Sequence, residues 1–377
     1  MGSMNKIGAI LIISIAWNGI GITEEAAGPP SALSIEHVYT GEEFGNLSGG
    51  IKKGHAYRGN FDLTLTVDTE KAGLWKGGAF FLYFEDGHGK SITNEYIGDL
   101  QVLSNIDARE FSQISEYYIG QSFMDGRLCF KIGKQDANVD FNVTDSAVEF
   151  INSSFGLMPN VPIPTFPDPS LGVSGCMSFT ENVSMRAGIF DGEGYGGNWG
   201  FSTAFGSDAA GVSVGELGIT HEYLGKGAIK LGAWHHGGKC YSLRGTRMRT
   251  SNYGGYLILE EQIIGSDEGK DTPCLSAFLQ YGAAPGEFNE ITNYIGVGIR
   301  ASGFTAPRPK DSFGLGMARA VMSDDLPGMK DETAMEAYYL ASFCHSVTAQ
   351  PDVQYIMNPG GNGKDALVTG IRFSLGF

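Results

Sequence analysis

The amino-acid sequence predicts an all-β protein: a 16-stranded antiparallel transmembrane β-barrel whose third long loop folds inward. Two observations support this prediction. One is an alternating segment at the end of the chain, and the other is a set of sixteen strand-like segments whose connections alternate between short and long. In outer-membrane barrels, alternate residues face lipid and lumen, and short periplasmic turns alternate with longer extracellular loops.

Residues 366–377 form the clearest predicted strand, because apolar and polar positions alternate there with a period of two. One face carries Leu367, Thr369, Ile371, Phe373, Leu375 and Phe377, and the other carries Val368, Gly370, Arg372, Ser374 and Gly376. Such a segment with a terminal aromatic residue is typical of the closing strand of an outer-membrane barrel. We expect outer-membrane lipid to contact its apolar face and the barrel-assembly machinery to recognise the strand through Phe377. A strand of a soluble β-sandwich is the alternative.

Composition favours one barrel domain over several soluble ones. The chain has 377 residues, of which 56 are glycine, and only 18% of residues are charged. Glycine at roughly twice its average usage suits turns, barrel bends and close backbone approaches. The mean hydropathy of −0.08 fits an apolar surface that alternates with a polar interior. The net charge of −16 disfavours nucleic acid as a partner.

The first 27 residues are predicted to be a cloning remnant followed by a signal peptide, which leaves 28–377 as a single barrel domain. Met1-Gly-Ser precedes a second methionine, and Lys6 then precedes an apolar run from Ile7 to Ile22. A cationic start, an apolar segment and small residues near a cleavage site are typical of a secretory signal. A transmembrane anchor is the alternative, although a run of about 16 residues is short for a membrane helix.

Sixteen segments carry the residue pattern of strands, and their connections provide a test of the barrel. Links from even to odd strands are mostly tight, as at 124–126, 180–182, 224–226 and 345–346, whereas links from odd to even strands are often long, as at 87–111, 136–170, 192–211 and 237–251. A soluble sandwich or propeller has no reason to keep this order. An even strand count places both chain ends on the periplasmic side. The predicted strands are 31–44, 57–69, 77–86, 112–124, 127–135, 171–180, 183–191, 212–223, 226–236, 252–263, 273–282, 291–302, 311–322, 333–344, 347–357 and 365–377.

The third long connection, 136–170, differs from the others in composition. It contains the carboxylates Asp136, Asp140, Asp145 and Glu149, followed by Pro159, Pro162, Pro164, Pro167 and Pro169. Proline cannot donate to a β-ladder and restricts the backbone, so this segment can hold a fixed path that is not a strand. We expect an acidic loop that folds into the lumen and narrows it, so that its carboxylates face basic residues of the wall across a narrow gap. An exposed proline-rich loop is the alternative.

Five stretches of the chain, in order, closely resemble carbohydrate-selective porins of the OprB type. They are GNFDLTLTVDTEKAGLWKGG (59–78), GDLQVLSNI (98–106), QSFMDGRL (121–128), GKQDAN (133–138) and FINSSFG (150–156). The resemblance covers about 33–377 and is densest between 39 and 192. The chain departs from the family pattern in its five cysteines and in a divergent second half.

The resemblance implies a channel of a Gram-negative outer membrane that passes glucose and related mono- and disaccharides by passive, selective diffusion. It implies small sugars as partners, no cofactor and no enzymatic activity, and it leaves a monomer and a trimer both open. A less selective general diffusion porin is one alternative. An outer-membrane barrel enzyme is another, although no Ser, His and acid set gathers at one rim of the predicted strands.

The alternation of each strand also predicts which side chains face the lumen. Arginine and carboxylate groups hydrogen-bond sugar hydroxyls, and aromatic rings stack on the C–H faces of a sugar. Arg58, Arg127, Lys131, Arg186 and Arg372 are favoured in the constriction, because the first and last strands become neighbours when the barrel closes. We expect sugar to pass through the narrow gap between such basic residues and the acidic loop at 136–170. The full predicted pathway is Arg58, Asn60, Asp62, Arg127, Lys131, Asp136, Asp140, Asp145, Glu149, Arg186, Trp234, Arg300 and Arg372.

Several other motifs do not support a site. The GxGxxG pattern at 192–197 and the nucleophile-elbow pattern at 211–215 both lack a following helix. His235 and His236 have no ligand partner at a recognisable spacing. The five scattered cysteines support neither a disulfide framework nor a zinc site. The sequence leaves open a weak calcium site at 86–89 or 324–325.

Overall fold

The computed structural model describes residues 31–192, 197, 199–204, 210–265, 273–305, 307–344 and 346–376. The predicted leader at 1–27, the centre of the glycine motif at 193–196 and the terminal Phe377 lie outside the described residues. Among the described residues, no helix combines the length and the apolar composition needed to cross a membrane.

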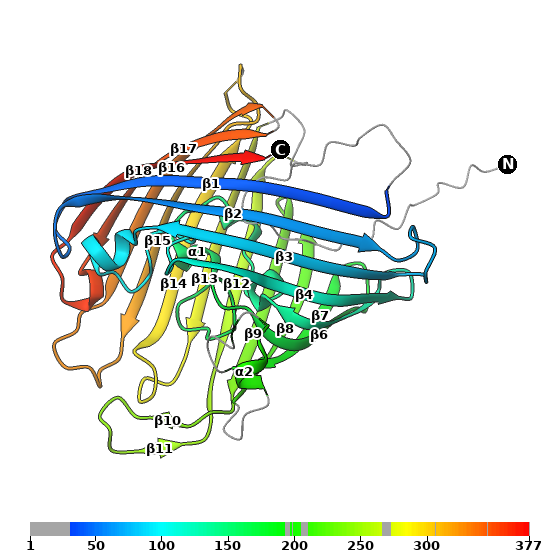
Figure 1. Cartoon of the computed structure of the whole chain (residues 1–377). Helices are drawn as coiled ribbons and strands as arrows, with labels where there is room; N and C mark the ends of the chain where they lie inside the picture. Colours follow the sequence, from blue (N-terminus) through cyan, green and yellow to red (C-terminus); the bar gives the residue numbers. More distant parts are fainter. Residues whose placement is uncertain are drawn as a thin grey trace.

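Sixteen antiparallel strands form one closed barrel, as the sequence predicts (Figure 1). The barrel closes where the first strand pairs with the last, with Glu42 opposite Arg372. A separate two-stranded hairpin, β10 (Cys240–Tyr241) with β11 (Met248–Arg249), lies in the connection after β9. The barrel strands are β1 (Leu33–Ser48), β2 (Gly54–Asp68), β3 (Gly78–Gly89), β4 (Phe111–Phe123), β5 (Leu128–Gln135), β6 (Ser170–Ser178), β7 (Val183–Asp191), β8 (Gly211–Glu222), β9 (Lys226–His236), β12 (Asn252–Ile264), β13 (Cys274–Ala283), β14 (Ile291–Ser302), β15 (Ser312–Met322), β16 (Glu332–Cys344), β17 (Val347–Met357) and β18 (Ala366–Gly376).

The two faces of each strand follow the predicted alternation. On β18, Leu367 and Ile371 are exposed on the outer face, whereas Val368 between them is fully buried. On β15, Leu315 is 57% exposed and Ala318 is 0% exposed. An outer face of exposed apolar side chains is stable only against lipid, and the strand period of two places the other residues in the lumen.

The four predicted long connections are confirmed, at 90–110, 136–169, 192–210 and 237–251, but the alternation is incomplete, because the β1–β2 link at 49–53 is shorter than the β2–β3 link at 69–77. The turn between β4 and β5 is tight because Met124, Asp125 and Gly126 all adopt positive φ angles of 53°, 54° and 89°, a geometry that suits the twist of a hairpin. The long connections lie at the other rim. In outer-membrane barrels the rim with the longer loops is the extracellular one.

Two long connections run into the interior of the barrel. The connection between β3 and β4 contains the π-helix η1 (Thr93–Ile97). The connection between β5 and β6 contains the short 3-10 helices η2 (Ala137–Val139) and η3 (Asp145–Ala147) and the helix α1 (Ser153–Gly156). Figure 1 shows α1 within the ring of strands. We call 90–110 the second loop and 136–169 the third loop.

The prediction that the cysteines form no disulfide was wrong for one pair. Cys129 on β5 lies opposite Cys176 on β6, with a Cα–Cα distance of 5.1 Å, and the two form a disulfide. The pairing comes from the strand register across 47 residues of sequence separation, which spacing rules do not detect. Cys240 and Cys274 are free thiols.

Candidate functional site

The third loop fills one side of the lumen with an apolar core. Phe150 packs edge-on against Tyr338 of β16 at 5.0 Å between ring centroids, and against Phe278 of β13 at 5.6 Å. Its neighbours Phe141 and Phe155 are 0% exposed. The loop therefore packs against β7 to β16. The core consists of Ala137, Phe141, Ala147, Phe150, Phe155, Met158, Val161, Ile163, Phe190, Val212, Val214, Trp234, Tyr256, Ile258, Phe278, Tyr294, Ala318, Tyr338 and Leu340.

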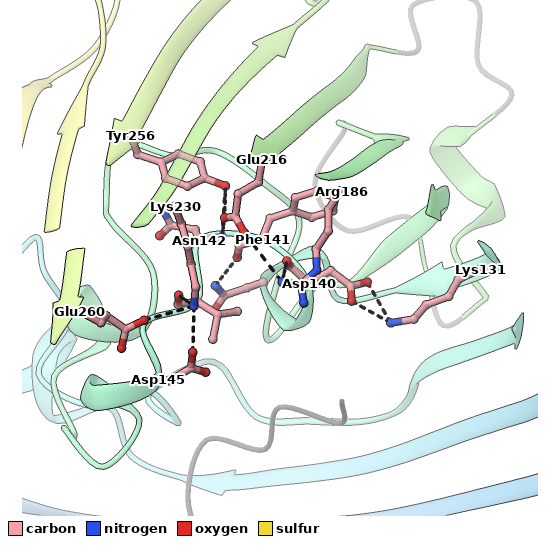
Figure 2. A network of polar contacts seen from close by, with 12 residues as sticks. Lys131, Asp140, Phe141, Asn142, Asp145, Arg186, Glu216, Lys230, Tyr256 and Glu260 are labelled. Atoms are coloured by element: carbon pink, nitrogen blue, oxygen red, sulfur yellow. Dashed lines mark hydrogen bonds and ion pairs between the residues drawn. The ribbon is translucent and has the colours of Figure 1, made fainter. Parts of the chain in front are cut away.

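Carboxylates on the barrel wall hold the backbone of this loop. Buried N–H groups that belong to no strand need acceptors. Three glutamates on the wall supply them. The bonds run from the backbone N of Asn142 to Glu216 (3.0 Å), of Ser146 to Glu260 (2.7 Å) and of Ile151 to Glu336 (2.6 Å). Figure 2 shows Glu216 receiving a further bond from Tyr256.

Cationic side chains of the wall meet the acidic residues of the loop in direct contact. Lys131 Nζ lies 2.9 Å from Asp140 Oδ2, and Lys230 Nζ lies 2.9 Å from Asp145 Oδ2 (Figure 2). Arg186 donates to the backbone oxygen of Asp140 at 3.1 Å. These pairs therefore fasten the loop to the wall. The sequence predicted bases and acids facing one another across an open gap, and at these positions the structure closes the gap.

Glu149 of the loop accepts three side-chain hydrogen bonds from the barrel wall. It accepts from Arg300 Nη2 at 2.7 Å, from Ser312 Oγ at 2.5 Å and from Tyr338 Oη at 3.0 Å. Burial alone would raise the pKa of Glu149, but these hydrogen bonds outweigh it and hold the pKa below its ordinary value. At neutral pH Arg300 and Glu149 therefore form a charged pair, which we call the clasp.

Asp136 ties the start of the third loop to its end. Its Oδ1 accepts from the backbone N of Asn138 at 2.7 Å, and its Oδ2 accepts from the backbone N of Phe166 at 3.1 Å. Thr165 donates to the same Oδ2 at 3.0 Å. One carboxylate therefore fixes both stems of the loop.

Two predicted arginines hold the second loop. Arg58 on β2 donates to the backbone oxygens of Ile106 at 2.7 Å and Arg109 at 2.8 Å. Arg372 on β18 donates to Glu42 at 2.8 Å and to Asn105 Oδ1 at 2.7 Å. Both arginines lie near the β1–β18 closure, where the sequence placed them.

The space left between the loops and the wall is a cavity of about 200 Å³. Strands β1 to β4 and β16 to β18 form its wall, and both inward loops contribute to its lining. Its ionisable lining residues among those described are Asp62, Glu85, Glu116, Asp136, Glu149 and Arg372, with Tyr83 and Tyr118. Thr40, Asn60, Thr64, Thr348, Gln350 and Ser374 add neutral polar groups, and Phe81, Val139, Val148 and Phe166 add apolar faces. We call this space the first cavity.

One wall of the first cavity is acidic. Asp62 on β2 and Glu85 on β3 are directly opposite in the strand register. Asn60 Nδ2 donates to Asp62 at 2.7 Å and to Glu85 at 3.4 Å, and Tyr83 donates to Asp62 at 2.6 Å. Two carboxyl groups in this position repel one another when both are ionised, and the shared amide and phenol donors reduce the cost of placing them together.

The comparisons with known proteins agree with this geometry. The family model described as "Carbohydrate-selective porin, OprB family" matches residues 52–377. The chain belongs to this family. The chain is 25% identical to Porin B of Pseudomonas aeruginosa over 394 residues, which cover 90% of this chain and 86% of that protein.

Solved structures of another porin share the fold. The high-pH structure of Pseudomonas putida OprB aligns with a TM-score of 0.83 at 23% identity, covering 92% of this chain and 94% of that one. The low-pH structure of the same protein aligns with a TM-score of 0.62 at 19% identity, covering 92% and 93%. The family and the closed barrel identify the chain as a carbohydrate channel of the Gram-negative outer membrane rather than an enzyme.

Two predicted pathway residues of this porin lie elsewhere, and we correct them. Arg127 lies in the exposed turn before β5, where its guanidinium donates to the backbone oxygens of Ser178 and Phe179. β5 begins one residue later than predicted, so Arg127 belongs to the turn before the strand. Its hydrogen bonds there stabilise the neighbouring periplasmic turn. Trp234 faces inward but is 2% exposed, because the third loop covers it. Its ring is not presented to a solute.

Sequence reasoning missed the second loop of the porin. Glu332 accepts from the backbone N of Leu100 at 2.8 Å and of Gln101 at 2.9 Å, and Ile97 and Leu103 are almost fully buried. The signal was present in the repeated apolar residues of a connection, since an exposed loop has little reason to carry them. Glu85, which lines the first cavity, was not among the predicted pathway residues.

Proposed function

We propose that this porin passes neutral mono- and disaccharides by passive, selective diffusion through the first cavity. The observation that carries the proposal is the lining of that cavity, where hydrogen-bond donors, acceptors and apolar faces lie within about 200 Å³. Sugar hydroxyls both donate and accept, and sugar C–H faces suit aromatic or aliphatic surfaces. A passage this narrow brings both kinds of contact to one ring at a time.

The groups on the two sides of the cavity differ in what they offer a sugar. Arg372 supplies donors from β18, and Asp62 with Glu85 supplies acceptors from β2 and β3. Tyr83 and Tyr118 contribute aromatic surface between them. Each contact replaces part of the hydration of the sugar without a tight fit, as a diffusion channel requires. The wall contacts of Asp140, Asp145 and Glu149 hold the third loop in place, so the passage does not widen.

A planar-bilayer experiment tests this proposal. Glucose, maltose and lactose are added to open channels, and the sugar-induced block of the ion current is recorded. Asp62→Asn keeps the shape of the cavity but weakens one acceptor, so the sugar block is expected to weaken more than the open conductance changes. A matched control is Asp331→Asn, which alters a partly exposed carboxylate paired with Arg319 on the outer face. Wild-type channels with no sugar block at all would contradict selective sugar passage.

A general diffusion porin that favours cations is the second candidate, and a specific observation supports it. The described lining of the first cavity contains five carboxylates, Asp62, Glu85, Glu116, Asp136 and Glu149, against the single arginine Arg372. Where these groups are ionised, a low-dielectric passage lined in this way attracts cations and repels anions. Reversal potentials in a salt gradient separate this candidate from the first when they are combined with the sugar-block recordings.

Two predictions about partners accompany the proposal. We infer that the barrel-assembly machinery recognises the C-terminal strand through Phe377, and that the porin assembles as a monomer or a trimer. The exposed apolar outer face supports contact with outer-membrane lipid. Native-state mass measurement in detergent distinguishes the two assemblies.

A further inference from the structure

A second cavity of about 220 Å³ lies against β7 to β9, beside the third loop. Val139, at the end of η2, lines both this cavity and the first one, so it is the partition between them. Gly218 and Thr220, which also line the second cavity, lie near the end of β8 and the tight turn that follows it. The second cavity therefore faces the periplasmic mouth.

The second cavity, like the first, is lined by hydrogen-bond donors, hydrogen-bond acceptors and apolar groups. Asp145 presents a carboxylate whose side chain is 73% exposed, and the side chain of Arg186 is 34% exposed. Ser184 and Thr220 add hydroxyl groups, and Val143 adds apolar surface. Donors, acceptors and apolar faces are thus all available to a solute.

The polar groups of this cavity are held in place before any solute arrives. Lys230 Nζ bonds the backbone oxygen of Val143 at 2.8 Å, Asp145 at 2.9 Å and Glu260 at 3.2 Å (Figure 2). Arg186 is fixed by its bond to the backbone oxygen of Asp140. A preorganised set of groups binds more tightly than a mobile one, because less freedom is lost on binding.

We propose that the second cavity is a separate binding site for one neutral sugar ring, divided from the first cavity by Val139. The proposal rests on the proposed sugar passage. The size agrees, because 220 Å³ is the space of about seven waters at ~30 Å³ each, which is of the order of one monosaccharide ring. A disaccharide with one ring in each cavity would span the partition.

The residence time of sugar in single channels tests this site. Wild-type channels are expected to show two classes of glucose block, one for each cavity. Gly218→Val fills the second cavity from the wall, since a Cβ there lies 3.0 Å from Ser184 Oγ and 4.0 Å from the backbone oxygen of Ser184. We expect this variant to retain one class of block. The matched control is Gly120→Val, whose Cβ makes only ordinary contacts, the nearest at 3.9 Å, and which lines neither cavity.

A second variant keeps the volume and removes the hydroxyls, in case Gly218→Val fails to fold. The double change Ser184→Ala with Thr220→Val is expected to shorten one class of block by about tenfold, the effect of losing two hydrogen bonds of ordinary strength. Val139→Ala removes the partition and should merge the two classes. Two unchanged classes of block in these variants would overturn the second site and leave the sugar passage standing. Wild-type channels without any glucose block would overturn the passage itself.

Discussion

The clasp between Arg300 and Glu149 predicts how firmly the third loop is held. Arg300 Nη2 lies 2.7 Å from Glu149 Oε1, and the two side chains are only 18% and 10% exposed. In Arg300→Ala, the carboxylate stays in its buried site without this charged donor. Breaking a buried pair by removing one partner costs about 3–5 kcal/mol. We therefore expect the loop to leave the wall far more often in this variant than in the wild type.

The size of the effect follows from the exposure of the pair. A cost of about 3–5 kcal/mol corresponds to a change of about 10² to 10³ or more in the equilibrium between docked and released loop. Arg319→Ala is the matched control, because Arg319 Nη2 lies 2.6 Å from Asp331 Oδ2 but the side chains are 52% and 28% exposed. An exposed pair of this kind contributes about 0–1 kcal/mol.

Single-channel recording in planar bilayers measures the result. Arg300→Ala is expected to show larger or flickering conductance and a weaker discrimination between glucose and maltose, whereas Arg319→Ala should resemble the wild type. If both variants gave the steady conductance and the sugar block of the wild type, the clasp would not control the passage. Equal barrel yields on gels that detect heat modification would confirm that both variants fold.

Three further predictions test the faces, the pH response and the assembly signal. Leu65→Arg should lower the stability of the barrel by about 2–4 kcal/mol if its outward position is near the bilayer centre, and its folding yield in lipid vesicles should fall accordingly. Thr64→Arg places the charge in the first cavity and should fold nearly normally. The reverse order of yields would show that the β2 register is wrong. The pKa of Glu149 lies below its ordinary value, so its stabilising contribution is complete above the unfolded pKa of about 4.3 and is lost as the pH falls through the lower folded pKa. The part of the conductance response that depends on the Arg300–Glu149 pair, measured as the difference between the wild type and Arg300→Ala, should therefore change only below about pH 4, and a loss of this difference already at neutral pH would contradict the role of the pair. Removing Phe377 should lower the yield of assembled barrel in the outer membrane without changing the conductance of the channels that do assemble.

The sequence could predict every feature that depends on local alternation. Leu367 and Ile371 lie outward and Arg372 lies inward because a strand repeats every two residues, whatever it packs against. The order of short and long connections then implied a barrel, since each pair of strands must cross the membrane and return. The resemblance in residues 59–156 added the family. These inferences use contacts between residues that are close in the chain or features that recur along it.

Only the tertiary structure could assign the partners of the lumen charges. The sequence predicted that Asp140 and Asp145 face basic residues. Their partners, Lys131 and Lys230, depend on the path of the third loop across a barrel that β1 and β18 close. Glu149 finds Arg300 at 151 residues of separation, and Trp234 is covered by a loop that lies far from it in sequence. No local period encodes such contacts. Closure of the barrel determines these contacts, because it brings strands that are distant in sequence around one lumen. Both inward loops pack against the wall of that lumen.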